Sequence, residues 1–284
     1  MAQRNVPTGR RRRLATEIRR MREQAGISLV EAARRLGVDR TMLSNVEAGR
    51  TGISEDRVRW FAHHYECHEP ALIEALAKMA VGRKARHWWE EYRGKIPEGF
   101  LDVSEVEHHA HRLRTAQTVH LPGLFQTEDH ARALFNLVVP PLSRLEIELR
   151  VAHRMARRQV IEREDPVPYV GIIHEAALRM EFGGRAVARS QLRGLVEATE
   201  REHVTLLVIP FRAGSFHGAG QSILYAEGPV RALDTVQLDT AHGSYFADAP
   251  TPLANYRSLL DLMEASALPQ EESRDFIHAI VRDL

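Results

Sequence analysis

The stretch SLVEAARRLGVDRTMLSNVEAGR, residues 28–50, decides how the first part of this chain folds. Its apolar residues recur three and four positions apart on each side of Gly37, which is the spacing of two short amphipathic helices. Ser28 and Asp39 stand where helix N-caps are expected, and Glu31 follows Ser28 at the distance of a capping box. Glycine allows a sharp turn between the helices. We therefore predict a helix-turn-helix whose second helix is short enough to enter a major groove.

Helical patterns continue outward from this stretch in both directions. We expect residues 1–66 to form an all-α domain of four or more short helices. Residues 67–97 are predicted to be a linker helix, with its regular part over 71–93 ending at the Trp88–Trp89 pair.

The remaining chain, residues 98–284, predicts a mixed α+β domain, because candidate strands alternate with helices before a helical end. A small sheet of about four strands is expected. The candidate strands are 167–174, 204–211, 221–226 and 231–238. The candidate helices are 175–182, 186–202, 251–265 and 270–283, after a mostly helical stretch over 101–163.

Composition is that of an ordinary globular protein, with 44% hydrophobic and 27% charged residues among 284. No apolar run approaches the roughly 18 residues that a membrane span needs, so no membrane association is expected. The basic N-terminus has no apolar segment behind it, which argues against a secretory signal and for the cytoplasm. Cys67 is the single cysteine, which excludes an internal disulfide and a cysteine-based zinc cluster.

Charge is distributed unevenly along the chain. Residues 1–66 hold 14 arginines against 8 acidic residues, a formal charge of +6, whereas the remainder carries −5. A small basic domain on a larger acidic one indicates an anionic partner for the basic domain. The run Arg10–Arg13 has two open interpretations, a solvated helix start or direct contact with phosphates.

The helix-turn-helix stretch resembles the lambda-repressor and Cro-like family, also called the xenobiotic-response-element (XRE) family. The matching pattern is Ala33, Leu36-Gly37-Val38, Leu43-Ser44, Glu47 and Gly49. The resemblance implies a lambda-repressor-like domain that binds double-stranded DNA. It also implies that Glu47 holds the fold.

The same resemblance implies which residues touch DNA. The exposed half of the recognition helix would carry Arg40, Thr41, Ser44 and Asn45. There an arginine can donate two hydrogen bonds to guanine, and an asparagine can pair with adenine. Ser28 and Leu29 would open the preceding helix, whose amides point at a phosphate. Arg50 would contact another phosphate. Leu29 departs from the family pattern, which commonly has glutamine early in this helix.

Several segments of the larger part resemble, in order, the C-terminal domain of actinobacterial developmental regulators of the WhiJ type. They are LPGLFQTEDHARAL (121–134), HRMARRQ (153–159), HEAALRMEFGG (174–184), IPFRAGSFH (209–217) and ALPQEES (267–273). The resemblance implies a DNA-binding regulator, often encoded beside a small partner protein and in some cases antitoxin-like. His130 stands here in place of the family's tyrosine.

Catalytic, cofactor-binding and metal-binding residues are not assigned. His108, His109 and His111 could share a metal, but a solvated or partly packed helix face explains them better. No nucleophile elbow, zinc-protease motif or dinucleotide loop occurs, so an enzyme is not expected.

The leading hypothesis is a sequence-specific transcriptional regulator, bound to the nucleoid as a homodimer on a palindromic operator. Its C-terminal domain would sense a partner protein or a small-molecule ligand. The alternative is an antitoxin-like interaction module that binds a small partner protein and regulates its own gene. Dimer contacts are expected outside residues 1–66, in the Trp88–Trp89 segment and in the C-terminal helices. The apolar candidates in those helices are Leu259, Leu260, Leu262 and Met263, some of which must form the core of the second domain itself.

Overall fold

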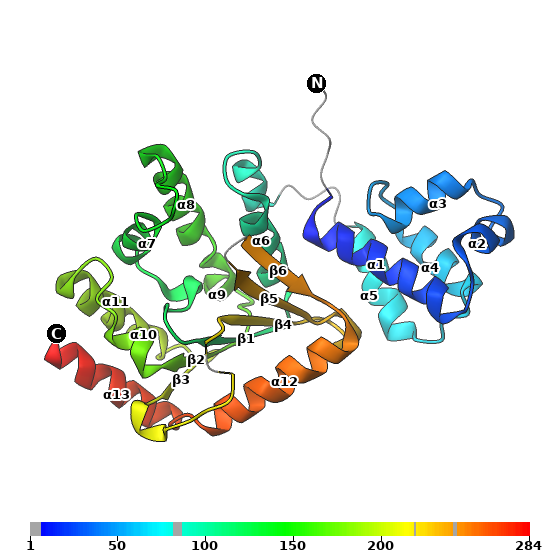
Figure 1. Ribbon diagram of the computed structural model, residues 1–284. Coiled ribbons are helices and arrows are strands. Elements are labelled where there is room, and N and C mark those ends of the chain that lie inside the picture. The colour runs from blue at the N-terminus through cyan, green and yellow to red at the C-terminus, as the bar shows by residue number, and fades with distance from the viewer. Residues whose placement is uncertain (1–6, 82–86, 219, 241–242) are drawn as a thin grey trace. The chain divides into compact units, whose positions relative to one another are not determined.

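The computed structural model describes residues 7–81, 87–218, 220–240 and 243–284 (Figure 1). The chain divides into two compact units: Met1–Trp88 with Pro229–Leu233, and Trp89–Gly228 with Asp234–Leu284. In these described ranges, no helix combines the length and the apolar character needed to cross a lipid bilayer.

The described part of the first unit is helical. Its elements are α1 (Gly9–Gln24), α2 (Leu29–Arg35), α3 (Arg40–Glu47), α4 (Glu55–His64), α5 (Pro70–Val81) and the short 3-10 helix η5 (Arg231–Leu233). Apolar side chains from α1, α3, α4 and α5 form one core that includes Ile18, Leu43, Phe61 and Leu76. The predicted all-α helix-turn-helix domain is confirmed.

Helix α5 contacts α1 and α4, and its Leu72 and Leu76 are buried in the same core. These residues were predicted to belong to a linker helix over 67–97. The rest of that range contains the 3-10 helix η2 (Trp88–Tyr92), while residues 82–86 lie outside the described residues. Trp89 is 1% exposed and packs within the second unit.

The second unit is built on a six-stranded mixed sheet in the order β3-β2-β1-β4-β5-β6. The strands are β1 (Arg112–Gln117), β2 (Tyr169–His174), β3 (Val204–Ile209), β4 (Ile223–Glu227), β5 (Thr235–Thr240) and β6 (Gly243–Ala247). The first three are parallel, with helices in the crossovers, and the last three continue the sheet as antiparallel neighbours. The predicted α+β class is confirmed, with a larger sheet than expected.

Two of these strands, β1 and β6, were missed in the sequence. Strand β1 falls inside 101–163, which was predicted to be mostly helical. Its sequence RLRTAQ is rich in good helix formers, and its place in the centre of the sheet comes from pairing with β2 and β4. Strand β6, GSYFA, is short and begins with a turn-forming glycine. Its pairing with β5 decides its conformation.

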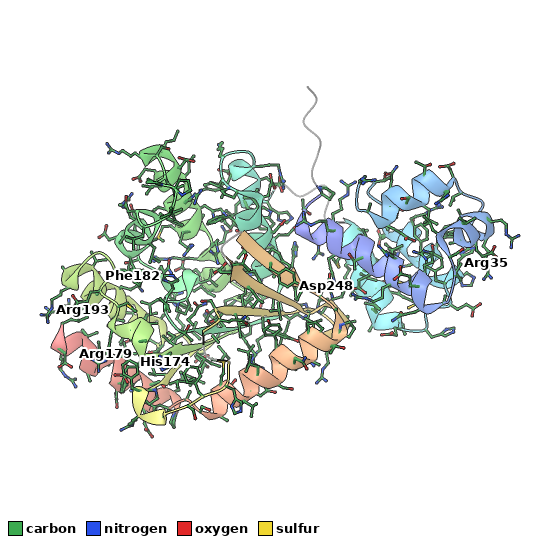
Figure 2. All side chains as sticks on the ribbon, viewed as in Figure 1. Arg35, His174, Arg179, Phe182, Arg193 and Asp248 are labelled. Carbon is green, nitrogen blue, oxygen red and sulfur yellow. The ribbon has the colours of Figure 1, made fainter. Side chains whose placement is uncertain are left out.

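Helices flank this sheet. They are α6 (Glu98–His109), α7 (Glu128–Phe135), α8 (Arg144–Ala156), α9 (Gln159–Glu162), α10 (Glu175–Arg179), α11 (Arg185–Ala198), α12 (Pro250–Ala265) and α13 (Gln270–Asp283), with 3-10 helices η3 (Gly123–Phe125) and η4 (Phe211–Ala213). His174 ends β2 and caps α10, since its Nδ1 accepts from the amide of Ala176 at 3.2 Å (Figure 2). Helices α7 and α8 pack on each other around Ala131, Phe135 and Val151.

The two faces of the sheet have separate cores. Leu113 of β1 faces the core that contains residues of α11 and α13, whereas Ala116 faces the core that contains residues of α12. The predicted dimer residues Leu260 and Met263 belong to this second core and are 0% and 1% exposed. These two candidates therefore belong to the core of the second unit, because α12 uses them to cover the sheet.

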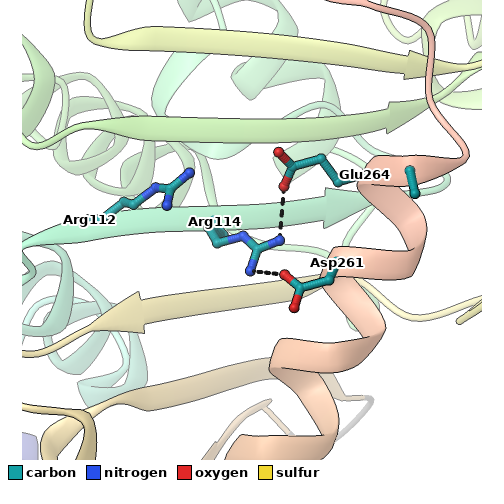
Figure 3. Close-up of a pocket in the computed structure, with 5 residues that line it drawn as sticks. Arg112, Arg114, Asp261 and Glu264 are labelled. Atoms are coloured by element: carbon teal, nitrogen blue, oxygen red, sulfur yellow. Dashed lines mark hydrogen bonds and ion pairs between the residues drawn. The ribbon is translucent and has the colours of Figure 1, made fainter.

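A buried arginine also ties α12 to the sheet. Arg114 of β1 pairs with Asp261 at 2.7 Å and with Glu264 at 2.9 Å (Figure 3). These three residues, with Arg112 and Ala265, line an open hollow. The two carboxylates neutralise the guanidinium that a central strand has removed from water.

The outer edge of β3 is closed by the C-terminal part of the chain. The amide of Leu268 donates to the Val208 carbonyl at 2.8 Å, and the Val208 amide donates to Ser273 Oγ at 2.9 Å. Strand groups that would otherwise face solvent are thereby paired.

His153 makes the second unit sensitive to acid. It is fully buried on α8, and its Nε2 lies 2.9 Å from Ser104 Oγ. Burial, together with the charges of Arg157 and Arg154, lowers its pKa from 6.5 to about 3. The folded state therefore binds this proton less readily than the unfolded state, and stability present above pH 6.5 is lost as the pH falls toward 3.

We predict that His153→Gln makes the decline of the unfolding free energy between pH 6.5 and 4.5 shallower by about 1 kcal/mol per pH unit, because one depressed group is removed. Urea titrations of the full chain across this range measure the slope. His278→Gln, at an exposed site on α13, is the control and should keep the wild-type slope. Equal slopes in all three proteins would contradict the prediction.

Candidate nucleic-acid interface

Helices α2 and α3 meet at a turn that their own side chains cap. Ser28 Oγ accepts from the Glu31 amide at 3.2 Å, and Gly37 adopts a φ of 60°. Asp39 Oδ1 accepts from the amides of Thr41 and Met42 at 2.7 and 3.1 Å, which lowers the pKa of the Asp39 carboxyl. Both predicted caps are therefore present.

The predicted capping box is only half formed. The carboxylate of Glu31 accepts from Arg34 at 2.8 Å and from Arg35 at 2.7 Å. These exposed ion pairs lower the pKa of Glu31 to about 2. The Glu31 carboxylate therefore accepts hydrogen bonds from the two arginines one turn later in α2, and not from the backbone amide of Ser28 as a capping box requires.

Helix α3 is held in place by an ion pair with α1. Arg22 donates to both carboxylate oxygens of Glu47, at 2.7 and 2.8 Å, and to the Ile27 carbonyl at 2.7 Å. The two side chains are 8% and 7% exposed, and the hydrogen bonds to Glu47 raise the pKa of Arg22. Leu43 and Val46 anchor the same helix in the core. Glu47 therefore has the structural role that the resemblance implied.

The predicted base-reading residues lie on the opposite face of α3 from Leu43 and Val46. Arg40 and Thr41 are exposed, while Ser44 and Asn45 are half-buried. Their positions, one turn apart in two pairs, give one continuous polar face. The structure thus presents all four side chains on a common face of the helix.

The predicted phosphate-contacting residues flank this face. Arg50 is exposed, and its Nη1 lies 3.4 Å from Asn45 Oδ1. Ser28 is exposed at the start of α2, whereas Leu29 is half-buried and packs against the core of the unit. Leu29 can therefore offer its backbone amide to a phosphate, but its side chain is used for packing.

Many arginines of the first unit are already paired with carboxylates. The pairs include Arg13 and Arg20 with Glu17, Arg19 with Glu23, and Arg59 with Glu55 and Glu74. Within the described residues, Arg40 and Arg50 form no such pair. Uncompensated positive charge therefore lies at the start of α3 and just after its end.

The arginine run before the motif serves the fold in part. Arg13 is buried and pairs with Glu17 at 2.9 Å, while Arg11 donates to the carbonyl of Arg50. Sequence reasoning missed the role of Arg22. The available signal was a charged residue beside the apolar positions Ile18 and Met21 of α1.

The histidine group considered for a metal contacts an aromatic ring. The rings of His108 and His109 lie 5.0 and 6.4 Å from that of Trp89, in edge-on arrangements. Within the described residues, no group of three or more His, Cys, Asp or Glu could hold a metal ion.

Comparisons with known proteins match both units. A family model described as a helix-turn-helix domain matches residues 13–76, and a model described as "Domain of unknown function (DUF5753)" matches residues 100–279. Neither the curated proteins nor the solved structures give a significant match.

We predict that Glu47→Gln lowers the unfolding free energy of the first unit by about 3 kcal/mol, because Arg22 is left buried beside a neutral amide. Hydrogen exchange of the α3 amides in the full chain measures this loss. Glu74→Gln breaks the exposed pair with Arg59 and serves as the control, with an expected loss below about 1 kcal/mol. Similar losses in both variants would contradict a special role for the buried pair.

Proposed function

We propose, since the chain belongs to the DUF5753 family and carries a helix-turn-helix domain before it, that it is a sequence-specific DNA-binding transcriptional regulator. The observation that carries the proposal is the polar outer face of α3, with unpaired Arg40 at its start and a buried ion pair behind it. The protein would act in the cytoplasm, on the nucleoid. Its second unit would sense a small-molecule ligand or a partner protein, as in regulators of the WhiJ type.

Each residue of the interface has a proposed role. Arg40 would donate to guanine and Asn45 would pair with adenine, with Thr41 and Ser44 between them on the groove floor. Arg50 and the amides at the start of α2, from Ser28 and Leu29, would hold flanking phosphates. Because the Arg22–Glu47 pair holds α3 from the far side, these contacts need no rearrangement of the helix.

We further propose that the protein binds a palindromic operator as a homodimer. Helix α3 has eight residues and reads few base pairs, whereas two copies about 34 Å apart would read two half-sites. An exposed apolar patch is available for a protein contact near the tip of the α7–α8 hairpin. Its members are Leu137, Val139 and Leu145, which are 64%, 88% and 69% exposed.

The same patch favours a second candidate function. An antitoxin-like interaction module would use an exposed apolar surface to hold a small partner protein, and DNA binding would regulate its own gene. The two candidates differ in what covers Leu137, Val139 and Leu145 in solution. A second copy of the chain supports the first candidate, and a monomer with an uncovered patch supports the second.

The DNA-binding proposal is tested by selecting operators from random duplex DNA with the full-length protein. We predict that Arg40→Ala and Asn45→Ala each weaken binding to the selected site by about 1–3 kcal/mol, or roughly 5- to 150-fold. Fluorescence anisotropy measures the affinity. Wild-type binding should also weaken steeply with salt, as phosphate contacts release counterions.

Arg35→Ala is the matched control. Arg35 is an exposed arginine of the same unit that extends from α2 (Figure 2) and pairs with Glu31. Its loss removes the same charge away from the α3 face, so a change below about threefold is expected. If no sequence is enriched, or if Arg40→Ala and Asn45→Ala bind like the wild type, the proposed interface is wrong.

The dimer is tested by light scattering at micromolar concentration. We predict a dimeric wild type and a shift toward monomer in Leu145→Glu, because a buried carboxylate would face the apolar patch. Leu262→Glu, at a 46% exposed site on α12, tests the surface expected from sequence and should leave the dimer intact. A monomeric wild type would overturn the dimer, and dissociation by Leu262→Glu alone would move its interface to α12.

A further inference from the structure

Three arginines on one side of α8 and its continuation are unequally neutralised. Arg157 makes two bonds to the Glu107 carboxylate, at 2.9 and 2.6 Å, and both side chains are buried. Arg154, one turn earlier, forms no ion pair among the described residues. Its Nη1 donates to Gln126 Oε1, and its Nε is buried without a hydrogen-bond partner. Arg158 likewise donates to a neutral group, the Gln126 carbonyl.

Neutral acceptors satisfy hydrogen bonds but do not balance charge. Gln126 is itself buried, and its Nε2 donates to the Leu121 carbonyl at 2.7 Å, so its orientation is set. Burial, followed by the charge of Arg157, lowers the pKa of Arg154 to about 9. Arg154 is half-buried, and its guanidinium carbon lies 5.1 Å from the centre of the Phe135 ring. No carboxylate among the described residues pairs with it, and a partly buried charge without a counterion is unfavourable.

The backbone of η3 lies directly against these guanidinium groups. A Cβ atom at Gly123, in η3, would lie 3.4 Å from Arg154 Nη1 and 3.4 Å from both Nη atoms of Arg157. Glycine thus allows the chain to run directly against the two charges. The excess charge therefore lies beside backbone rather than beside another acid.

His130 supplies an independent second observation. It lies on α7, which packs against α8, and it is 1% exposed. Both of its ring nitrogens are buried without a hydrogen-bond partner. Its ring lies 5.8 Å from that of Phe182, and the Phe182 ring also lies 5.3 Å from that of His120. Figure 2 labels Phe182.

The neighbouring charges connect His130 to the arginines. Burial, His120 and Arg154 together lower the pKa of His130 to about 4, so that its ring is neutral at pH 7. A neutral imidazole buried with neither nitrogen bonded has one donor and one acceptor to offer. Buried polar groups of this kind call for an unseen water or ligand.

Asp239 is a further carboxylate whose negative charge influences Arg154. Asp239 of β5 is exposed, accepts from Gln237 at 2.7 Å, and forms no ion pair with Arg154 among the described residues. Arg114 shows the contrast within the same unit, since two carboxylates hold it. The region around Arg154 therefore keeps an excess of positive charge.

We propose that Arg154 and His130 form a binding site for an oxyanion, the carboxylate or phosphate group of a small ligand. Arg154 Nε would donate a hydrogen bond to the anion, and the opposite charges of Arg154 and the anion would balance each other. The neutral ring of His130 would donate a second hydrogen bond. Gly123, which lacks a Cβ, would keep side-chain atoms away from the Nη atoms of Arg154 and Arg157. As the site of an effector, the assignment rests on the proposed ligand-sensing role of the second unit, but anion binding itself can be measured without DNA.

The experiment titrates the full-length protein with sodium phosphate and, separately, sodium acetate, at constant ionic strength set with sodium chloride. Thermal unfolding and calorimetry report binding. A saturating anion should raise the Tm of the wild type by about 5 °C, as expected for a ligand that binds only the folded state. The stronger of the two probes identifies a phosphate or a carboxylate site.

Two variants locate the site. Arg154→Met should abolish the response, while its Tm in chloride alone should equal or exceed that of the wild type, because a half-buried charge without a counterion is gone. His130→Phe keeps a ring against Phe182 and should weaken anion binding about tenfold, the effect of one lost hydrogen bond. Arg193→Met, at an exposed site on α11, should respond like the wild type.

The inference is overturned if neither anion changes the wild-type Tm up to about 100 mM, or if Arg154→Met and His130→Phe keep the full response. A protein that binds its selected DNA but neither anion would refute this site and leave the proposed function intact. A protein that binds an anion through Arg154 but enriches no DNA would refute the proposed function and leave the site intact.

Discussion

Removing a guanidinium group from water is costly unless charge and hydrogen bonds replace the lost solvent, and both units of this chain are built around that requirement. Arg22 ties α1 to the recognition helix through Glu47. In the second unit, Arg157 ties α8 to α6 through Glu107, and Arg114 ties the central strand to α12. Each pair joins segments far apart in sequence. Once the arginine of such a pair is buried, the helix or strand that carries the carboxylate must lie where the carboxylate can reach that arginine.

Local features of the sequence were sufficient to predict the fold of the first unit. The caps at Ser28 and Asp39, the turn at Gly37 and the helical spacing all act within a few residues, so the helix-turn-helix could be predicted. The larger sheet could not be predicted in full. Strand β1 contains helix formers and a buried arginine, and its conformation is decided by β2 and β4. Propensity is a weak guide where tertiary pairing makes the choice.

The candidate DNA-binding residues followed from the resemblance to the lambda-repressor family, and helical periodicity agrees with it by separating Arg40, Thr41, Ser44 and Asn45 from the core positions of α3. The support behind that face did not, because no local rule pairs Arg22 with Glu47. The group around Arg154 is also beyond sequence periodicity. The resembling segments 121–134 and 153–159 contain its members, but only the packing of α7 on α8 and the backbone at Gly123 bring them together.

The closure of the β3 edge has a consequence for self-association. Leu268 and Ser273 occupy hydrogen-bonding groups of Val208 that a strand from another molecule would need. A strand from another molecule therefore cannot form hydrogen bonds with Val208 at that edge. The opposite edge of the sheet, strand β6, is only five residues long. Short or occupied edges hinder sheet-to-sheet polymerisation. Both edges of the sheet thus hinder the addition of strands from other molecules.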